Sequence, residues 1–111
     1  MSSVACRHLL LKHTGSRNPV SRRDNSQVTR SPDQAKAQLN DILKTITPVN
    51  FAQLAQQYSE CSSYKQGGDL GDFGRGVMDS NFEAASFALK VGEISGIVDS
   101  GSGSHLILRY K

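Results

Sequence analysis

Two histidines, a cysteine and a group of basic side chains carry most of the chemical potential of this 111-residue sequence. His8 and His105 each lie in a short run whose alternation predicts a β-strand. If these two strands are neighbours, the imidazole rings meet as a cross-strand pair. Such a pair either fixes the strand register by hydrogen bonding or takes part in catalysis. With Cys61, the two histidines also have the ligand types of a metal site.

Cys61 is open to several interpretations from its residue type alone. A thiol with histidines elsewhere in the chain is compatible with a Cys-His hydrolase, and a buried small hydrophobe is the plainer alternative. Cys6 is the other cysteine, and two are too few for the disulfide framework of a small secreted domain. Neither belongs to a C-x-x-C pair, which excludes a zinc ribbon and a thioredoxin-like motif.

Basic side chains are concentrated near the N-terminus. Residues 1–30 contain six basic residues and one acidic residue, whereas residues 31–111 contain seven and nine, within a net charge of +3. This asymmetry predicts a local anion site, for which a phosphorylated side chain is a suitable ligand because Arg binds phosphate bidentately. The alternatives are a solvated loop and nucleic acid, but no aromatic stacking platform lies near these bases. The candidate phosphate ligands are Lys12, Arg17, Arg22 and Arg23.

Hydrophobic spacing predicts the elements that must position these side chains. Residues 4–12 form a strand with Cys6, His8 and Leu10 on one face, and residues 13–30 form a loop broken by Gly, Asn-Pro and Ser. Ser31-Pro32 opens a helix that ends at Thr47-Pro48. Its buried face is expected to consist of Ala35, Leu39, Ile42 and Ile46.

The remaining elements are shorter. Asn50 is expected to cap a second helix, with Phe51, Leu54, Ala55 and Tyr58 on its apolar face. We expect strands over 69–73, 94–98 and 105–110, a helix over 81–90, and a turn over 99–104 that joins the last two strands as an antiparallel hairpin. The order β-α-α-β-α-β-β predicts a single α+β domain over residues 1–111.

The composition of the chain limits where in the cell it is expected to act. No apolar run approaches the ~20 residues that span a bilayer, so we expect no membrane partner. The N-terminal residues do not have the pattern of a secretory signal. We therefore expect a cytoplasmic and nuclear protein, since 12.0 kDa is small enough for passive exchange.

Five blocks of the sequence resemble the parvulin family of peptidyl-prolyl cis/trans isomerases. They cover nearly the whole chain in order and are specific as a set: RHLLLKH, FAQLAQQYSECSS, GGDLGDFGRGVM, FEAASFALKVGEISGIV and SGSHLILR. The cysteine in SECSS and the basic first loop resemble the Pin type, which acts on phospho-Ser/Thr-Pro bonds. Many Pin-type proteins carry a WW domain, and this chain is similar to the members without one.

The resemblance implies a fold and a set of site residues. The implied fold is a four-stranded antiparallel sheet surrounded by about four helices, in the order β-α-α-α-β-α-β-β. Leu70, Met78 and Phe82, which would otherwise be ordinary core residues, correspond to the proline-ring pocket. Parvulins need no metal, so no cofactor is expected. The implied catalytic group is His8, Cys61, Ser100, Ser102 and His105.

The implied activity is non-covalent rotation of X-Pro bonds, with phosphorylated Ser/Thr-Pro proteins as substrates and a monomeric enzyme. Two positions depart from the Pin-type pattern. Asn18 stands where a second arginine is usual, in a loop one residue longer, and Asp79 stands where Gln is common. These departures leave open a parvulin without phosphate dependence. A non-enzymatic module that binds phosphopeptides or nucleic acid is a further alternative.

Overall fold

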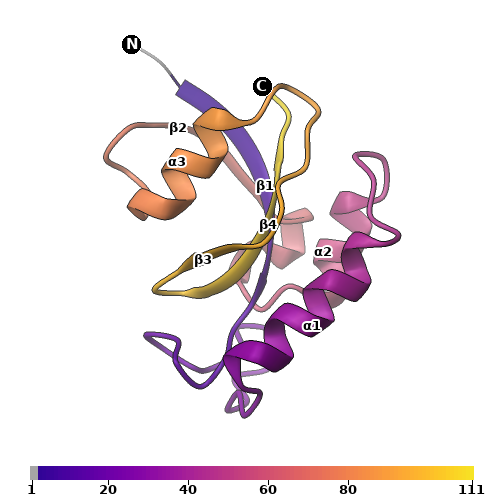
Figure 1. Cartoon of the computed structure of the whole chain (residues 1–111), viewed down its shortest axis with the longest axis vertical. Helices are drawn as coiled ribbons and strands as arrows, with labels where there is room; N and C mark the ends of the chain where they lie inside the picture. Colours follow the sequence, from indigo (N-terminus) through magenta and orange to yellow (C-terminus); the bar gives the residue numbers. More distant parts are fainter. Residues whose placement is uncertain (1–2) are drawn as a thin grey trace.

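A computed structural model of the chain describes residues 3–111 (Figure 1). Its sheet has four antiparallel strands in the order β2-β1-β4-β3. The strands are β1 (Ser3–Leu11), β2 (Asp69–Gly74), β3 (Val98–Ser100) and β4 (Gly103–Arg109). The helices are α1 (Pro32–Leu43), α2 (Phe51–Tyr58), the 3₁₀ helix η1 (Ser62–Gln66) and α3 (Ser80–Ala88). This order confirms the predicted α+β class, with η1 as the third helical element.

The sheet is the middle of three layers (Figure 1). Because side chains alternate along a strand, Leu9 and Leu11 of β1 face α1 and α2 and share a core with Leu106 and Leu108 of β4. The opposite face carries a second core, on which α3 packs; its members include Val4, Cys6, Phe73, Phe82 and Ile107. His8 and His105 lie on this second face, as the alternation predicts.

Helix α1 begins as predicted and ends earlier. Ser31 accepts a hydrogen bond from the Gln34 amide, and the Gln34 side chain accepts one from the Ser31 amide, which forms a capping box. The predicted end at Thr47-Pro48 is wrong, because regular helix stops at Leu43 and the chain tightens into turns. The Asn50 side chain holds those turns through the Thr47 amide and the Thr45 carbonyl, instead of capping α2.

The predicted C-terminal hairpin is confirmed, but its first strand lies later in the sequence than predicted. The predicted strand over 94–98 is wrong, since Ile94 makes only an isolated bridge to Leu108 and β3 begins at Val98. Ser95 accounts for the difference. Its hydroxyl accepts from the Ile107 amide, so a side chain replaces part of the ladder. Consequently the turn is shorter than predicted, and Ser100 and Gly103 pair across it.

The edge of β1 beyond Arg7 is closed by irregular backbone instead of β2. Gly68 accepts from the His8 amide, Ser59 accepts from the Leu10 amide through its hydroxyl, and Glu60 donates its amide to the Leu10 carbonyl. These bonds place Cys61 beside the half of β1 that contains His8 and Leu10. None of the helices within residues 3–111 is both long enough and apolar enough to cross a bilayer.

Candidate active site

The two predicted histidines meet on the α3 face of the sheet. His8 pairs with Ile107 and His105 with Leu10 in the ladder, so the two rings are diagonal neighbours. Their Nδ1 atoms lie 3.0 Å apart. The Nε2 of His105 lies 2.7 Å from the Ser100 hydroxyl, which also accepts from the Ser102 amide at 3.1 Å. Burial, followed by the charge of His8, lowers the pKa of His105 well below its usual value, so this ring stays neutral.

Cys61 lies at the His8 end of this hydrogen-bonded chain. Within residues 3–111, His8 Nε2 and Ser63 Oγ are the two buried side-chain nitrogen or oxygen atoms without a hydrogen-bond partner. The same two residues influence the ionisation of Cys61. Burial raises the pKa of Cys61, but the hydrogen bond and charge of His8, together with Ser63, outweigh it and lower the pKa to about 6. Cys6 differs, because burial raises its pKa and its side chain is fully enclosed.

A pocket of about 200 Å³ opens above the histidine pair. Phe82 lines this pocket beside the pair, with edge-on contacts to His105 at 5.0 Å and to His8 at 5.5 Å between ring centroids. Leu70 from β2 and Met78 from the loop before α3 supply the apolar walls. Cys61, Ser100, Ser102 and the two histidines complete the lining, together with Asp79 at the start of α3. The structure therefore brings together all three predicted proline-pocket residues and all five predicted catalytic residues.

A second pocket of about 250 Å³ is basic. It contains three of the four predicted phosphate ligands, Lys12, Arg17 and Arg22, and its other lining residues are Leu10, Asn18, Cys61, Ser62 and Ser102. Cys61 and Ser102 line both pockets, so the apolar and the basic pocket share a wall. Within residues 3–111, the guanidinium groups of Arg17 and Arg22 make no hydrogen bond or ion pair, which leaves their donors available to an anion.

Arg23 lies away from the basic pocket. Its guanidinium donates to the carbonyls of Gln56 at 2.6 Å and Ser59 at 3.1 Å, which closes the C-terminal end of α2. It also stacks on the Tyr64 ring, 4.4 Å from the centroid. Of these two adjacent arginines, only Arg22 therefore lines the basic pocket, where it could supply the guanidinium that Asn18 does not provide.

Lys12 is buried, and it organises the basic loop. Its Nζ donates to the carbonyls of Asn18 at 3.0 Å and Val20 at 2.7 Å, so one of its three donors is left for a ligand. Burial, followed by repulsion from Arg22, lowers the pKa of Lys12, and Cys61 and Glu60 partly offset this. A bound anion would offset the repulsion further.

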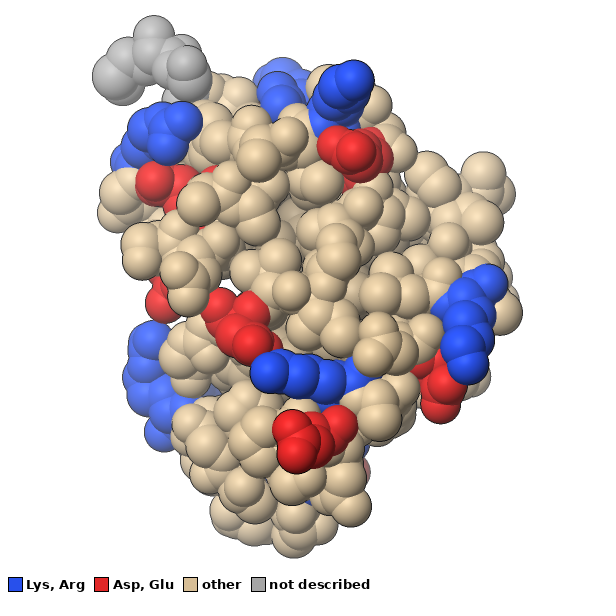
Figure 2. Space-filling model, viewed as in Figure 1, with Lys and Arg blue, Asp and Glu red and all other residues tan. Residues whose placement is uncertain are grey.

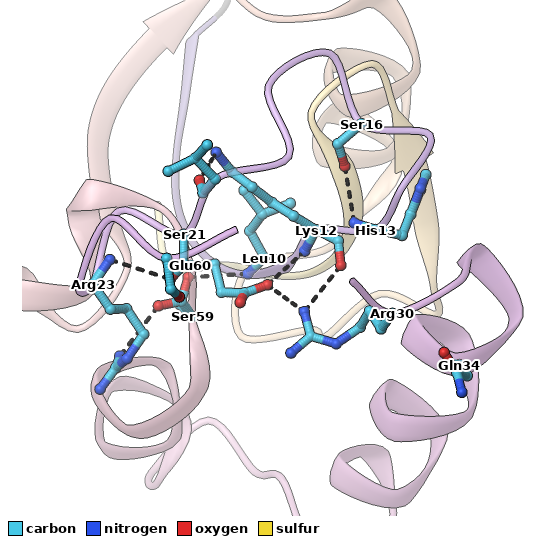
Figure 3. Close-up of polar contacts among 12 residues, drawn as sticks. Leu10, Lys12, His13, Ser16, Ser21, Arg23, Arg30, Gln34, Ser59 and Glu60 are labelled. Atoms are coloured by element: carbon cyan, nitrogen blue, oxygen red, sulfur yellow. Dashed lines mark hydrogen bonds and ion pairs between the residues drawn. The ribbon is translucent and has the colours of Figure 1, made fainter. Parts of the chain in front are cut away.

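A partly buried ion pair beneath the basic loop, between Glu60 and Arg30, was not predicted (Figure 3). The Glu60 carboxylate accepts from the Lys12 amide at 2.8 Å and pairs with Arg30, which also donates to the Lys12 carbonyl at 2.9 Å. The amide of Arg22 donates to the Glu60 carbonyl. One acidic residue thus ties both ends of the loop to β1. The position of Glu60 directly before Cys61 was the one feature of the sequence that could have indicated its place near the site.

The hydrogen bonds of the histidines bear on the metal-site interpretation. Both Nδ1 atoms are used on each other, and His105 uses its second nitrogen on Ser100, which leaves His8 Nε2 as the one nitrogen without a partner. Within residues 3–111, no three His, Cys, Asp or Glu side chains gather in an arrangement that would hold a metal ion.

Known proteins share this arrangement of elements. The family model described as Rotamase, the PPIC-type PPIase domain, matches residues 8–111. The peptidyl-prolyl cis-trans isomerase Pin1 of Digitalis lanata is 50 % identical over 113 residues, covering 96 % of this chain and 94 % of the relative. ESS1 of Saccharomyces cerevisiae, also named a peptidyl-prolyl cis-trans isomerase, is 48 % identical over 110 residues. The chain spans 64 % of the length of ESS1 and the same share of a 51 % identical Drosophila melanogaster relative.

Solved structures agree with the sequence comparisons. The solution structure of TbPIN1 superimposes with a TM-score of 0.88 at 43 % identity and covers both chains completely. The crystal structure of the PPIase domain of TbPar42 has a TM-score of 0.89 at 35 % identity and covers 97 % of this chain and 99 % of that one. The chain therefore belongs to the PPIC-type, or parvulin, family of peptidyl-prolyl cis/trans isomerases.

Proposed function

We propose that this chain isomerises X-Pro bonds without a covalent intermediate and prefers substrates in which the preceding Ser or Thr is phosphorylated. One observation carries the proposal. An apolar pocket and a basic pocket share the wall formed by Cys61 and Ser102. A phosphorylated Ser-Pro unit likewise joins an apolar ring to a dianion across one peptide bond. The names Pin1 and ESS1 of the relatives support the same assignment.

Isomerisation of a prolyl peptide bond requires control of the bond's conformation and does not require a nucleophile. Rotation about a prolyl peptide bond crosses a barrier of roughly 18–20 kcal/mol, because it breaks amide resonance. A ten-thousandfold acceleration needs about 5.4 kcal/mol of differential stabilisation of the twisted bond. Holding the ring at one end and the phosphate at the other supplies part of it when the twisted geometry fits the two pockets best.

The shared wall faces the bond that rotates. Cys61, Ser102 and nearby backbone amides are the groups available to contact the carbonyl as it turns. The apolar side chains around them reduce hydration of the imide, which favours the twisted form because its charge separation is smaller. His8 and His105 form the floor, and their mutual hydrogen bond holds the pocket in one shape.

A phosphate-independent isomerase is the second candidate, and Asp79 favours it. Its carboxylate lines the proline pocket, where it repels a substrate dianion. The arginines of the basic loop would then act only as a solvated surface, and Lys12 would only support the loop. A nucleic-acid module receives less support, because the face seen in Figure 2 carries basic and acidic side chains next to one another.

Cis/trans exchange measured by NMR on three matched peptides tests the proposal. The peptides contain phospho-Ser-Pro, Glu-Pro and unmodified Ser-Pro. We expect strong exchange with the first and weak exchange with the last. Comparable exchange with all three would favour the phosphate-independent enzyme, and no exchange with any would favour a binding module. Substrate identity, a monomeric state and cytoplasmic and nuclear localisation stay predictions.

A further inference from the structure

Arg17 reaches the basic pocket by lying across the turn between β3 and β4. Its backbone amide donates to the Gly101 carbonyl at 2.7 Å, which joins the basic loop to this turn. A Cβ atom at position 101 would overlap Nη2 of Arg17 and lie 3.2 Å from its Cζ and 3.3 Å from its Nε. The guanidinium therefore occupies the space that any side chain at position 101 would need.

The turn itself is held by side-chain contacts on both flanks. Ser100 is bonded to His105 on one flank, and Ser104 donates to Asp99 at 2.7 Å on the other. Asp99 is held further by an ion pair with Lys36 at 3.3 Å and by its carbonyl, which accepts from Asn81 at 3.2 Å. With the turn fixed, a side chain at position 101 displaces the far end of the flexible Arg17 side chain.

We propose that Gly101 is a positioning residue that sets phosphate preference through Arg17. This inference rests on the proposed function of the basic pocket. The backbone at Gly101 does not lie in the left-handed region, so alanine is tolerated there without backbone strain. Only the place of the Arg17 guanidinium depends on the missing side chain, and no charge changes in the Gly101→Ala variant.

The test compares the kcat/KM values of five variants for phospho-Ser-Pro and unmodified Ser-Pro peptides. Gly101→Ala should lose about tenfold on the phosphopeptide, the order expected for a weakened charged hydrogen bond, and little on the unmodified peptide. Gly96→Ala is the matched control, because a Cβ atom at that glycine meets nothing within 4 Å. Thermal unfolding and amide spectra verify the fold, and Gly101→Ser provides a second displacement of Arg17.

The remaining two variants are Arg17→Ala and the double variant that combines it with Gly101→Ala. If Gly101 acts through Arg17, the double variant matches Arg17→Ala alone, because the two effects are not additive. Additive losses, or an equal loss on both peptides, would overturn the inference. The inference would also be overturned if Gly101→Ala kept its preference for the phosphopeptide while Arg17→Ala lost it. In that case the proposed function of the basic pocket would still stand. If the wild-type enzyme showed no preference for the phosphopeptide, both the inference about Gly101 and the proposed phosphate preference would be overturned.

Discussion

The Nδ1 atoms of His8 and His105 lie 3.0 Å apart, so one ring must donate a proton to the other. His105 is neutral, since burial lowers its pKa well below the usual value, so one of its ring nitrogens donates and the other accepts in the contacts to His8 and Ser100. The orientation of His8 is thereby fixed from β4, and the hydrogen bond and charge of His8 lower the pKa of Cys61. The histidine pair thus controls the ionisation of the thiol in the shared wall.

We predict that Cys61 is mostly a thiolate at neutral pH. Because its pKa is lowered from 9.0 to about 6, the ionised fraction rises as the pH rises through about 6. At pH 7 there are about ten thiolates for each thiol. The rate of alkylation by iodoacetamide should follow this titration. A Cys6→Ala background removes the second cysteine, which is buried and whose pKa is raised.

Two substitutions at His8 distinguish the roles of its two ring nitrogens. The side-chain amide of His8→Asn replaces the Nδ1 contact with His105 but supplies nothing at the Nε2 position, so the pKa of Cys61 should rise toward 9.0. His8→Gln places its amide near Nε2 and should preserve more of the reactivity. If the alkylation rate of the wild-type chain had its midpoint near pH 9, the influence of His8 on the pKa of Cys61 would be contradicted.

Arg22 and Arg23 are adjacent in sequence and should behave differently. Arg22→Ala removes a guanidinium from the basic pocket, so kcat/KM for the phosphopeptide should fall about tenfold while that for unmodified Ser-Pro changes little. Arg23→Ala instead uncovers the end of α2 and the Tyr64 ring. It should lower the free energy of unfolding by about 1–2 kcal/mol and leave the ratio of the two peptide rates unchanged. The opposite pattern would place Arg23 in the pocket.

The Glu60–Arg30 pair should matter more for stability than the ion pairs on the surface. The side chain of Glu60 is 9 % exposed and that of Arg30 is 26 % exposed, and the carboxylate also satisfies the Lys12 amide. Glu60→Ala leaves the buried Lys12 amide without a partner and the half-buried Arg30 guanidinium with only the Lys12 carbonyl, so urea unfolding should show a loss of about 2 kcal/mol. Asp41→Asn removes an exposed pair with Lys44 and should cost less than about 0.5 kcal/mol. Equal losses would mean that Glu60 adds no special support to the loop.

Periodic segments of the fold were predictable from the sequence. Alternation along β1 placed His8 on the face opposite Leu9, and the capping signals at Ser31 and Pro32 marked the start of α1. Segments where side chains replace backbone partners were not predictable. The hydroxyl of Ser95 interrupts the ladder where apolar alternation predicted a strand. Local pattern carries no information about such tertiary substitutions.

The site shows the same division. The proline pocket and the histidine pair followed from residue types together with the family resemblance. The distinction between Arg22 and Arg23 did not follow, because both lie in an aperiodic loop whose path is set by Lys12 and Glu60. Likewise, the consequence of having no side chain at Gly101 is visible only after the loop and the turn are placed together.

Gly68 and Gly71 offer a matched test of how closely the chain before β2 approaches β1. Both have positive φ, +80° and +70°, so alanine costs about 1–2 kcal/mol at either position from backbone strain alone. At Gly71 a Cβ atom meets nothing within 4 Å, whereas at Gly68 it would overlap the carbonyl oxygen of His8. Gly68→Ala should therefore unfold the chain or cost more than about 3 kcal/mol, and any folded fraction should lose isomerase activity because His8 is displaced. Similar urea midpoints for the two variants would show that Gly68 does not hold the strand that carries His8.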